Sequence, residues 1–160
     1  CAKVLRGIGF EAELKWPNDI LIHGKKIAGV LTETVTQGED IAVIIGIGIN
    51  VNMPTTSLEA IGQPATSLLE LSQKTWDLKE LTELLMNHFL QDLELLKKSG
   101  FAPFQTPFEK ILAYKGQEIT CRDGTQVIKG ICHSITKDGR LQLQLPSGEI
   151  KLVLAGEVEV

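Results

Sequence analysis

Residues 40–52 (DIAVIIGIGINVN) constrain the fold most, because they form a nearly continuous apolar run rich in β-branched side chains. Valine and isoleucine favour extended backbone, and a strand that is apolar at successive positions is typically buried on both faces. The run therefore predicts a buried central strand of a sheet.

The segments before this run predict its neighbours in the sheet. Residues 11–16 alternate between polar and apolar, and the runs at 19–23 and 26–35 flank a short HGKK turn that is typical of a hairpin. We therefore expect a mainly antiparallel meander. Residues 2–10 resemble the end of an amphipathic helix closed by glycine, with no start signal before it, so we expect that the chain begins inside an element and is a fragment.

Two helices are predicted after residue 65. A short one should begin at Thr66 or Ser67, with Glu70 reaching back to cap it. A long one should begin at Asp77, continue with apolar residues every three or four positions, and end at the KKSG of residues 97–100.

The C-terminal part of the chain has a different pattern. Asp-Gly or Ser-Gly turn signals at 123–124, 138–139 and 147–148 separate short strands, which favours a small closed β-barrel. We therefore predict an α+β chain with one domain over residues 1–112 and a barrel over residues 113–160.

Composition excludes several classes of function. The net charge of −4 leaves no basic stripe for nucleic acid, and no apolar run approaches the roughly 18 to 20 residues that cross a bilayer. The three cysteines include no CxxC pair, so free thiols in a cytoplasmic protein are expected. Cys132 and His133 are adjacent on a predicted strand and should face opposite sides, which disfavours a metal site there.

The stretch KWPNDILIHGKKIAGVLTE (15–33) concentrates polar groups around strand ends. Pro17 cannot donate to a ladder, so the first strand should stop there and leave Asn18 and Asp19 facing a cleft. Gly29 inside the next strand indicates a bulge or a close ligand. The GIGIN of residues 46–50 lacks the third glycine of a dinucleotide fingerprint and precedes a loop with a proline, which disfavours that alternative.

The WPND, KIAGVL and GIGIN elements in this order, with PATSLLELSQ after them, closely resemble the catalytic domain of biotin–protein ligases. The last 45 or so residues are similar to the family's SH3-like C-terminal domain. The resemblance implies a class II synthetase-like sheet. It also implies ATP-dependent conversion of biotin to biotinyl-5′-AMP, followed by transfer of biotin to a lysine on a carboxylase's biotin carrier domain.

The resemblance also implies a role for particular residues. Lys26 would be the catalytic cation that bridges the biotin carboxylate and the phosphate, and its neighbour Lys25 would be an exposed partner on the opposite face. Asp19 would also hold a hydrated Mg²⁺. The residues expected to bind substrate or nucleotide are Lys15, Asn18, Asp19, Gly29, Gly46, Gly48 and Asn50.

The family's GRGRxxR loop and biotin-gripping residues lie upstream of WPND and are absent from these 160 residues, so we expect little or no ligase activity from the chain alone. Expected partners are a biotin carrier domain and a second copy in a homodimer, with no membrane and no nucleic acid. Two alternatives stay open: a non-catalytic module that docks a carrier domain or second protomer, and a lipoate–protein ligase.

Overall fold

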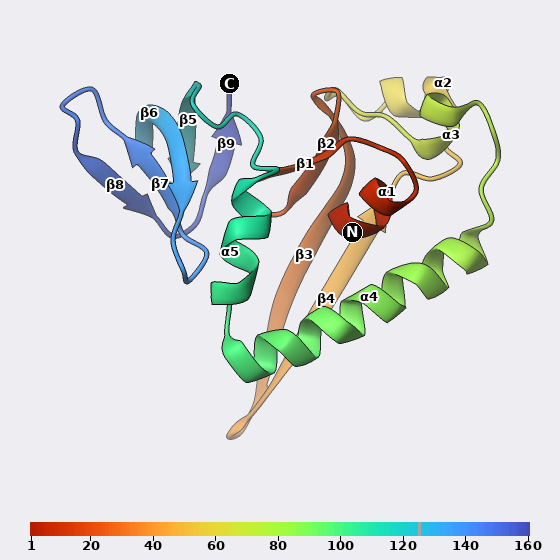
Figure 1. Cartoon of the computed structure of the whole chain (residues 1–160), viewed down its shortest axis with the longest axis horizontal. Coiled ribbons are helices and arrows are strands. Elements are labelled where there is room, and N and C mark those ends of the chain that lie inside the picture. Colours follow the sequence, from red (N-terminus) through yellow and green to blue (C-terminus); the bar gives the residue numbers. More distant parts are fainter. Residues whose placement is uncertain (125) are drawn as a thin grey trace.

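The computed structural model describes residues 1–124 and 126–160, which form two sheets with helices beside and between them (Figure 1). The first sheet has the order β1-β2-β3-β4, and every neighbouring pair is antiparallel. Its strands are β1 (Ala12–Lys15), β2 (Asp19–Ile22), β3 (Lys25–Gln37) and β4 (Asp40–Ile49). The predicted antiparallel meander is therefore confirmed.

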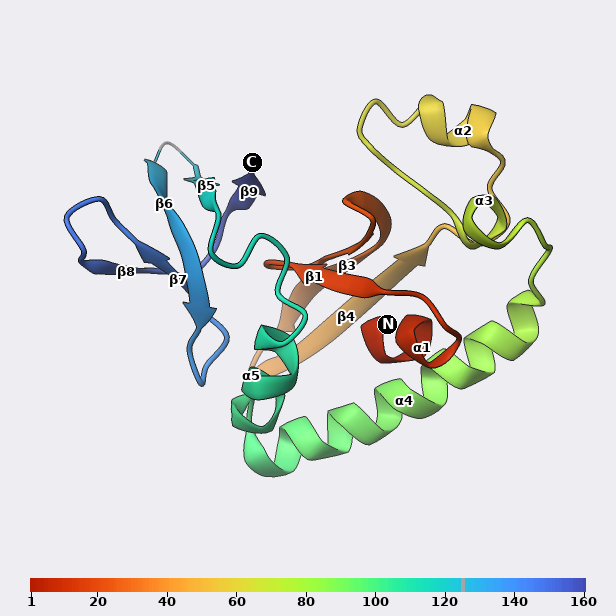
Figure 2. The ribbon, with the colours of Figure 1, turned by 45° about the horizontal axis from the view of Figure 1, so that its top comes forward.

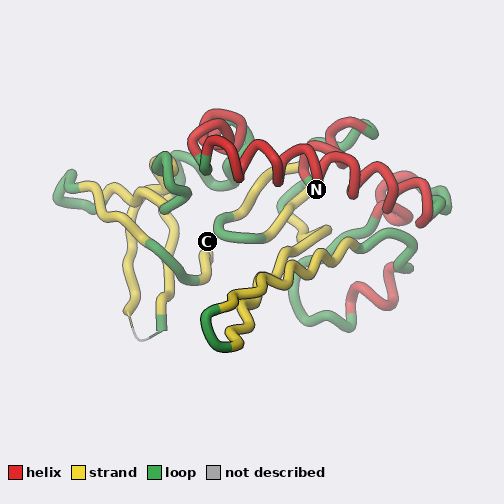
Figure 3. Tube along the Cα trace, turned by 90° about the horizontal axis from the view of Figure 1, so that it is seen from below, coloured by secondary structure: helices red, strands yellow, loops and turns green. Residues whose placement is uncertain are grey.

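The helices are α1 (Ala2–Gly7), α2 (Thr55–Glu59), α3 (Leu68–Ser72), α4 (Leu78–Ser99) and α5 (Ala102–Glu109). Apart from α2, they lie along one side of this sheet, and the tip of the β3–β4 hairpin extends away from them (Figure 3). The core under them combines buried side chains of α1 and β2 with Ile27, Leu68 and Leu81. None of the helices in the described part of the chain is long and apolar enough to cross a membrane.

The predicted turn and helix ends are found where the sequence places them. His23 and Gly24 both have positive φ, of 51° and 74°, as a tight two-residue hairpin requires. The Asp77 carboxylate accepts hydrogen bonds from the backbone N–H groups of Lys79 and Glu80, and Gly100 ends the helix. Of the two candidate caps of α3, Ser67 is the one whose hydroxyl accepts from the Glu70 N–H, at 3.0 Å.

One prediction about the sheet is wrong. The apolar run of residues 40–52 forms β4, but β4 is the edge strand of this sheet and most of it is exposed. The exposed fraction is 69% for Ile41 and 57% for Val43. Apolar side chains at successive positions favour cover on both faces, but here Ile47 and Ile49, at the end of β4, border a cavity with α4 while the earlier residues of β4 are exposed.

The second sheet has the order β8-β7-β6-β5-β9 and is antiparallel throughout. Its strands are β5 (Glu118–Asp123), β6 (Gln126–Ile135), β7 (Leu141–Gln144), β8 (Ile150–Val153) and β9 (Glu157–Glu159). The pairings found among the described residues do not join β8 to β9, so closure of the barrel stays a prediction, as does a division between residues 112 and 113.

The second sheet is attached to the first by the connector after α5. The N–H of Leu14 donates to the carbonyl of Ile111 at 2.7 Å, and the N–H of Ala113 donates to the carbonyl of Leu14 at 2.9 Å. The connector therefore adds a short stretch of parallel pairing to the free edge of β1. The Gln105 side chain of α5 also donates to the carbonyl of Ile135, at 2.8 Å. Figure 2 shows α5 and the connector between the two sheets.

The Cys132 thiol gives the fold a testable pH dependence. It is buried in the core of the second sheet, and burial raises its pKa from 9.0 to about 11. The folded state therefore keeps this proton at pH values where the unfolded chain has lost it. The stabilisation is fully present below pH 9 and is lost as the pH rises through 11.

We expect the free energy of unfolding of the wild type to fall by about 2 kcal/mol relative to Cys132→Ala between pH 9 and pH 11. Urea unfolding of both proteins at each pH measures this difference. Other titrating groups, including the Cys121 thiol whose pKa burial also raises, cancel in the comparison. A difference that does not change with pH would contradict the assignment.

Candidate active site

The predicted site residues of β1 to β4 gather on one face of the first sheet, opposite α1 and α4. Strand register places Lys15 opposite Asp19, Asp19 opposite Gly29, and Gly29 opposite Gly48. Residues that lie directly opposite one another in neighbouring strands share a face. The three strand connections therefore bring together residues that the sequence separates by more than 30 positions.

Lys26 reaches this face through a β-bulge. Leu21 lies opposite Lys26, whereas Ile20 lies opposite Ala28, so Ile27 is an extra residue in β3. If β3 alternated regularly, Lys26 and Gly29 would point to opposite faces, because they are three positions apart in the sequence. The bulge carbonyl of Ile27 accepts a hydrogen bond from the N–H of Asn50, at 2.8 Å. Strict alternation could not reveal this bulge, although a strand glycine is one of its signals.

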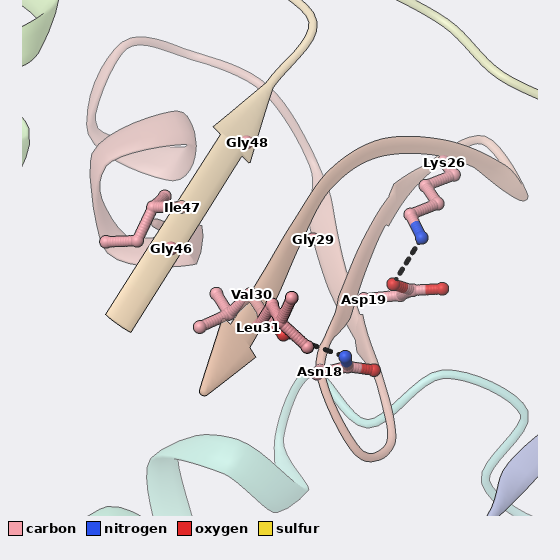
Figure 4. Close-up of a pocket in the computed structure, with 9 residues that line it drawn as sticks. All are labelled: Asn18, Asp19, Lys26, Gly29, Val30, Leu31, Gly46, Ile47 and Gly48. Atoms are coloured by element: carbon pink, nitrogen blue, oxygen red, sulfur yellow. Dashed lines mark hydrogen bonds and ion pairs between the residues drawn. The ribbon is translucent and has the colours of Figure 1, made fainter. Parts of the chain in front are cut away.

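The Lys26 amine forms an ion pair with Asp19, with Nζ 2.6 Å from Oδ1 (Figure 4). The Lys26 side chain is 31% exposed and the Asp19 side chain 15%. A pair with this little solvent contact is screened less than a surface pair, and its amine is already oriented toward the cleft. Lys25 behaves differently: it is half exposed and pairs with Glu70 at 3.3 Å, outside the cleft.

Asn18 holds the turn between β1 and β2 against β3. Its side-chain amide donates to the carbonyl of Val30 at 2.8 Å, and its own carbonyl accepts from the N–H of Val30 at 2.9 Å. The amide nitrogen therefore already has a protein partner here, and the contact fixes the backbone immediately before Asp19.

The ion pair lies beside a cavity of about 420 Å³ whose lining includes Gly29, Gly46 and Gly48. A Cβ on Gly29 would lie 3.2 Å from the Asp19 carboxylate and 3.2 Å from Lys26 Cε. At Gly46 and Gly48 the nearest atoms would be backbone oxygens at 3.7 and 3.9 Å. Gly29 therefore makes room for the ion pair, while the other two leave the floor of the cleft open.

The remaining predicted residues border the same region. Lys15 lines a neighbouring cavity of about 290 Å³ together with Asp19 and Lys26. Asn50 lines a third cavity on the other side of Gly48, and its side chain donates to the carbonyl of Thr66 at 3.1 Å. The structure thus brings all eight predicted residues to one continuous region, and their roles toward a ligand stay predictions.

Sequence reasoning missed the contribution of the C-terminal domain. Residues 156–158 form one wall of the cavity that holds Lys15, Asp19 and Lys26. No local signal in the sequence connects this segment to residues at least 130 positions earlier, so only the arrangement of the two sheets reveals it.

Comparison with known proteins gives this geometry its context. Residues 3–50 match the Biotin/lipoate A/B protein ligase family, and residues 115–160 match the Biotin protein ligase C terminal domain. The crystal structure of biotin protein ligase from Aquifex aeolicus has a TM-score of 0.84 and 33% identity, with 99% of this chain and 68% of that chain covered. The structure of the Aquifex aeolicus ligase in complex with biotin and ATP has a TM-score of 0.83 and 32% identity, with 99% and 66% covered.

The bifunctional ligase/repressor BirA of Escherichia coli (strain K12) is 32% identical over 161 residues, which cover 99% of this chain and 50% of BirA. Both parts of the chain thus match ligases that modify proteins. The chain belongs to the biotin protein ligase family. It spans about half the length of BirA and its Bacillus counterparts.

The close packing at Gly29 predicts an effect of adding one methyl group. In Gly29→Ala the new Cβ should shift the Lys26 side chain relative to Asp19 by a few tenths of an ångström, because both partners already lie within 3.3 Å of its position. A crystal structure of the variant should show the Lys26 amine displaced. Gly46→Ala is the matched control and should leave the pair in place, so an unmoved pair in Gly29→Ala would contradict the packing described here.

Proposed function

We propose that this chain forms the part of a biotin–protein ligase that holds the activated biotin. The reaction joins biotin and ATP to biotinyl-5′-AMP and pyrophosphate, and then transfers biotin to a lysine on the carrier domain of a biotin-dependent carboxylase. The observation that carries the proposal is the Lys26–Asp19 pair beside a glycine-lined cavity. A relative whose structure contains biotin and ATP supports it, and the match to the biotin-specific C-terminal domain favours biotin over lipoate.

The chemistry of the first step suits an amine in this position. A carboxylate oxygen of biotin attacks the α-phosphorus of ATP, the bond to the leaving pyrophosphate breaks, and negative charge gathers on the phosphoryl oxygens. A fixed cation in a partly desolvated cleft stabilises that charge without reorganising. Lys26 is the catalytic residue in this proposal, because its amine can contact both the carboxylate and the phosphate.

The second step uses the same surroundings. The carrier lysine amine attacks the acyl carbon of biotinyl-5′-AMP, an amide forms, and AMP leaves with its phosphate charge close to Lys26. Lys15 would lie on the phosphate side and Asn18 would hold the turn that presents Asp19. The backbone at Gly46 and Gly48 would lie under the nucleotide, with Asn50 at its far end.

Magnesium fits this site only when the phosphates of ATP supply further ligands. Asp19 offers one carboxylate, already paired with Lys26, and among the described residues no three His, Cys, Asp or Glu side chains gather as a ligand set. Mg²⁺ commonly binds one or two carboxylates and completes its shell with phosphate oxygens and water. We therefore assign the ion to Asp19 and the phosphates of ATP, where it would neutralise phosphate charge.

The two adjacent lysines provide a matched test of the site. Calorimetric titration with biotinyl-5′-AMP should show binding to the wild-type chain and at least about a tenfold loss of affinity in Lys26→Ala, which is about 1.4 kcal/mol. Lys25→Ala should bind within about twofold of the wild type, because its amine pairs with Glu70 outside the cleft.

Equal losses in both variants would contradict the assignment of Lys26. If the folded wild-type chain does not bind biotinyl-5′-AMP, but binds a biotin carrier domain regardless of nucleotide, the binding-module alternative replaces the proposed function. Ligase turnover by these 160 residues alone should be little or none, which a carrier-domain biotinylation assay checks.

A further inference from the structure

Trp16 belongs by sequence to the strand-turn segment of the site, but its side chain lies in the core of the second sheet. The indole is 5% exposed and packs in one cluster with Cys121, Leu141 and Val158. Its Nε1–H donates to the carbonyl oxygen of Gly139 at 3.0 Å, across 123 positions of sequence. The turn after β1 thus inserts one aromatic side chain into the core of the second sheet.

The backbone that carries this indole is the turn that presents the site. Residues 16–18 connect β1 to β2, and Lys15 lies opposite Asp19 at the base of the turn. Asn18 is joined to Val30 by two hydrogen bonds, and Asp19 is paired with Lys26. Only two residues separate the anchored indole from the carboxylate that orients the Lys26 amine.

Two other links to the second sheet lie outside this turn. The connector pairs with Leu14 in β1, and Gln105 of α5 bonds to Ile135. Neither link involves the Trp16 side chain. The indole is therefore placed to do something more specific than attach the domains: it fixes the turn relative to the wall formed by residues 156–158.

We propose that Trp16 is a positioning residue, whose indole, held in the core of the C-terminal domain, fixes the 16–18 turn so that Asp19 orients the Lys26 amine. The C-terminal domain then sets the geometry of the adenylate site from outside the sheet that bears it. The ligand part of this inference rests on the proposed function, whereas the positioning of the turn does not.

The first test needs no ligand. The Val30 amide, which bonds to the Asn18 carbonyl, should exchange with deuterium faster in both Trp16→Leu and Trp16→Phe than in the wild type. We expect an increase of at least about tenfold in Trp16→Leu and a smaller increase in Trp16→Phe. The Cys132 amide, bonded to the carbonyl of Gln117, reports on unfolding of the C-terminal domain and should change by a smaller factor than the Val30 amide in Trp16→Phe. Unchanged Val30 exchange, or Val30 and Cys132 changing by the same factor, would overturn the proposal.

Trp76→Phe is the matched control. Trp76 also has an indole hydrogen bond, to the Ser72 hydroxyl at 2.9 Å, but it packs within the first domain. Its substitution should leave exchange at Val30 within about twofold of the wild type. A Val30 change as large as that in Trp16→Phe would show a general effect of losing an indole and would overturn the specific role of Trp16.

The second test measures calorimetric affinity for biotinyl-5′-AMP. If the wild type binds, Trp16→Phe should bind about five- to tenfold more weakly while Cys132 exchange still shows a folded C-terminal domain, and Trp76→Phe should bind like the wild type. Equal affinity in Trp16→Phe and the wild type overturns the positioning role at the site. If the wild type does not bind, the proposed function fails, and the exchange measurement alone decides whether Trp16 fixes the turn.

Discussion

The bulge at Ile27 determines which side chains can meet in this molecule. One extra residue in β3 turns Lys26 onto the face that carries Gly29 and Asp19, and the Ile27 carbonyl accepts a hydrogen bond from the N–H of Asn50, just after β4. Ile27 and Ala28 are both buried although they are adjacent in a strand. The same irregularity thus serves the apolar core on one face and the charged cleft on the other.

The ion pair next to this bulge keeps the Lys26 amine in one orientation. A lysine amine in a cleft without a partner would lose solvation and sample many rotamers, whereas Asp19 keeps it in one place at the cost of partial neutralisation. An incoming phosphate or carboxylate then competes with Asp19 for an amine that is already oriented. The absent methyl group at Gly29 lets the pair lie flat against the sheet.

Local features of the fold follow from the sequence more reliably than the surroundings of each element. The His23–Gly24 turn, the Asp77 cap and the Gly100 stop depend on a few neighbouring residues, so their chemistry predicts them. The candidate site residues came from a family resemblance, and their meeting on one face could not be derived from alternation because the Ile27 bulge breaks it. The exposure of β4 and the burial of Trp16 in the second sheet's core depend on which other elements lie beside them. A residue pattern within one segment does not specify those neighbours.

The exposed β4 edge has a practical consequence for anyone who handles this chain in solution. Unpaired backbone groups flanked by Ile41, Val43 and Ile44 offer a template on which a second strand can pair. Contacts between molecules through such an edge grow with protein concentration. Apparent affinities and stabilities therefore need to be compared at one dilution, and extrapolated to low concentration before they are assigned to a single molecule.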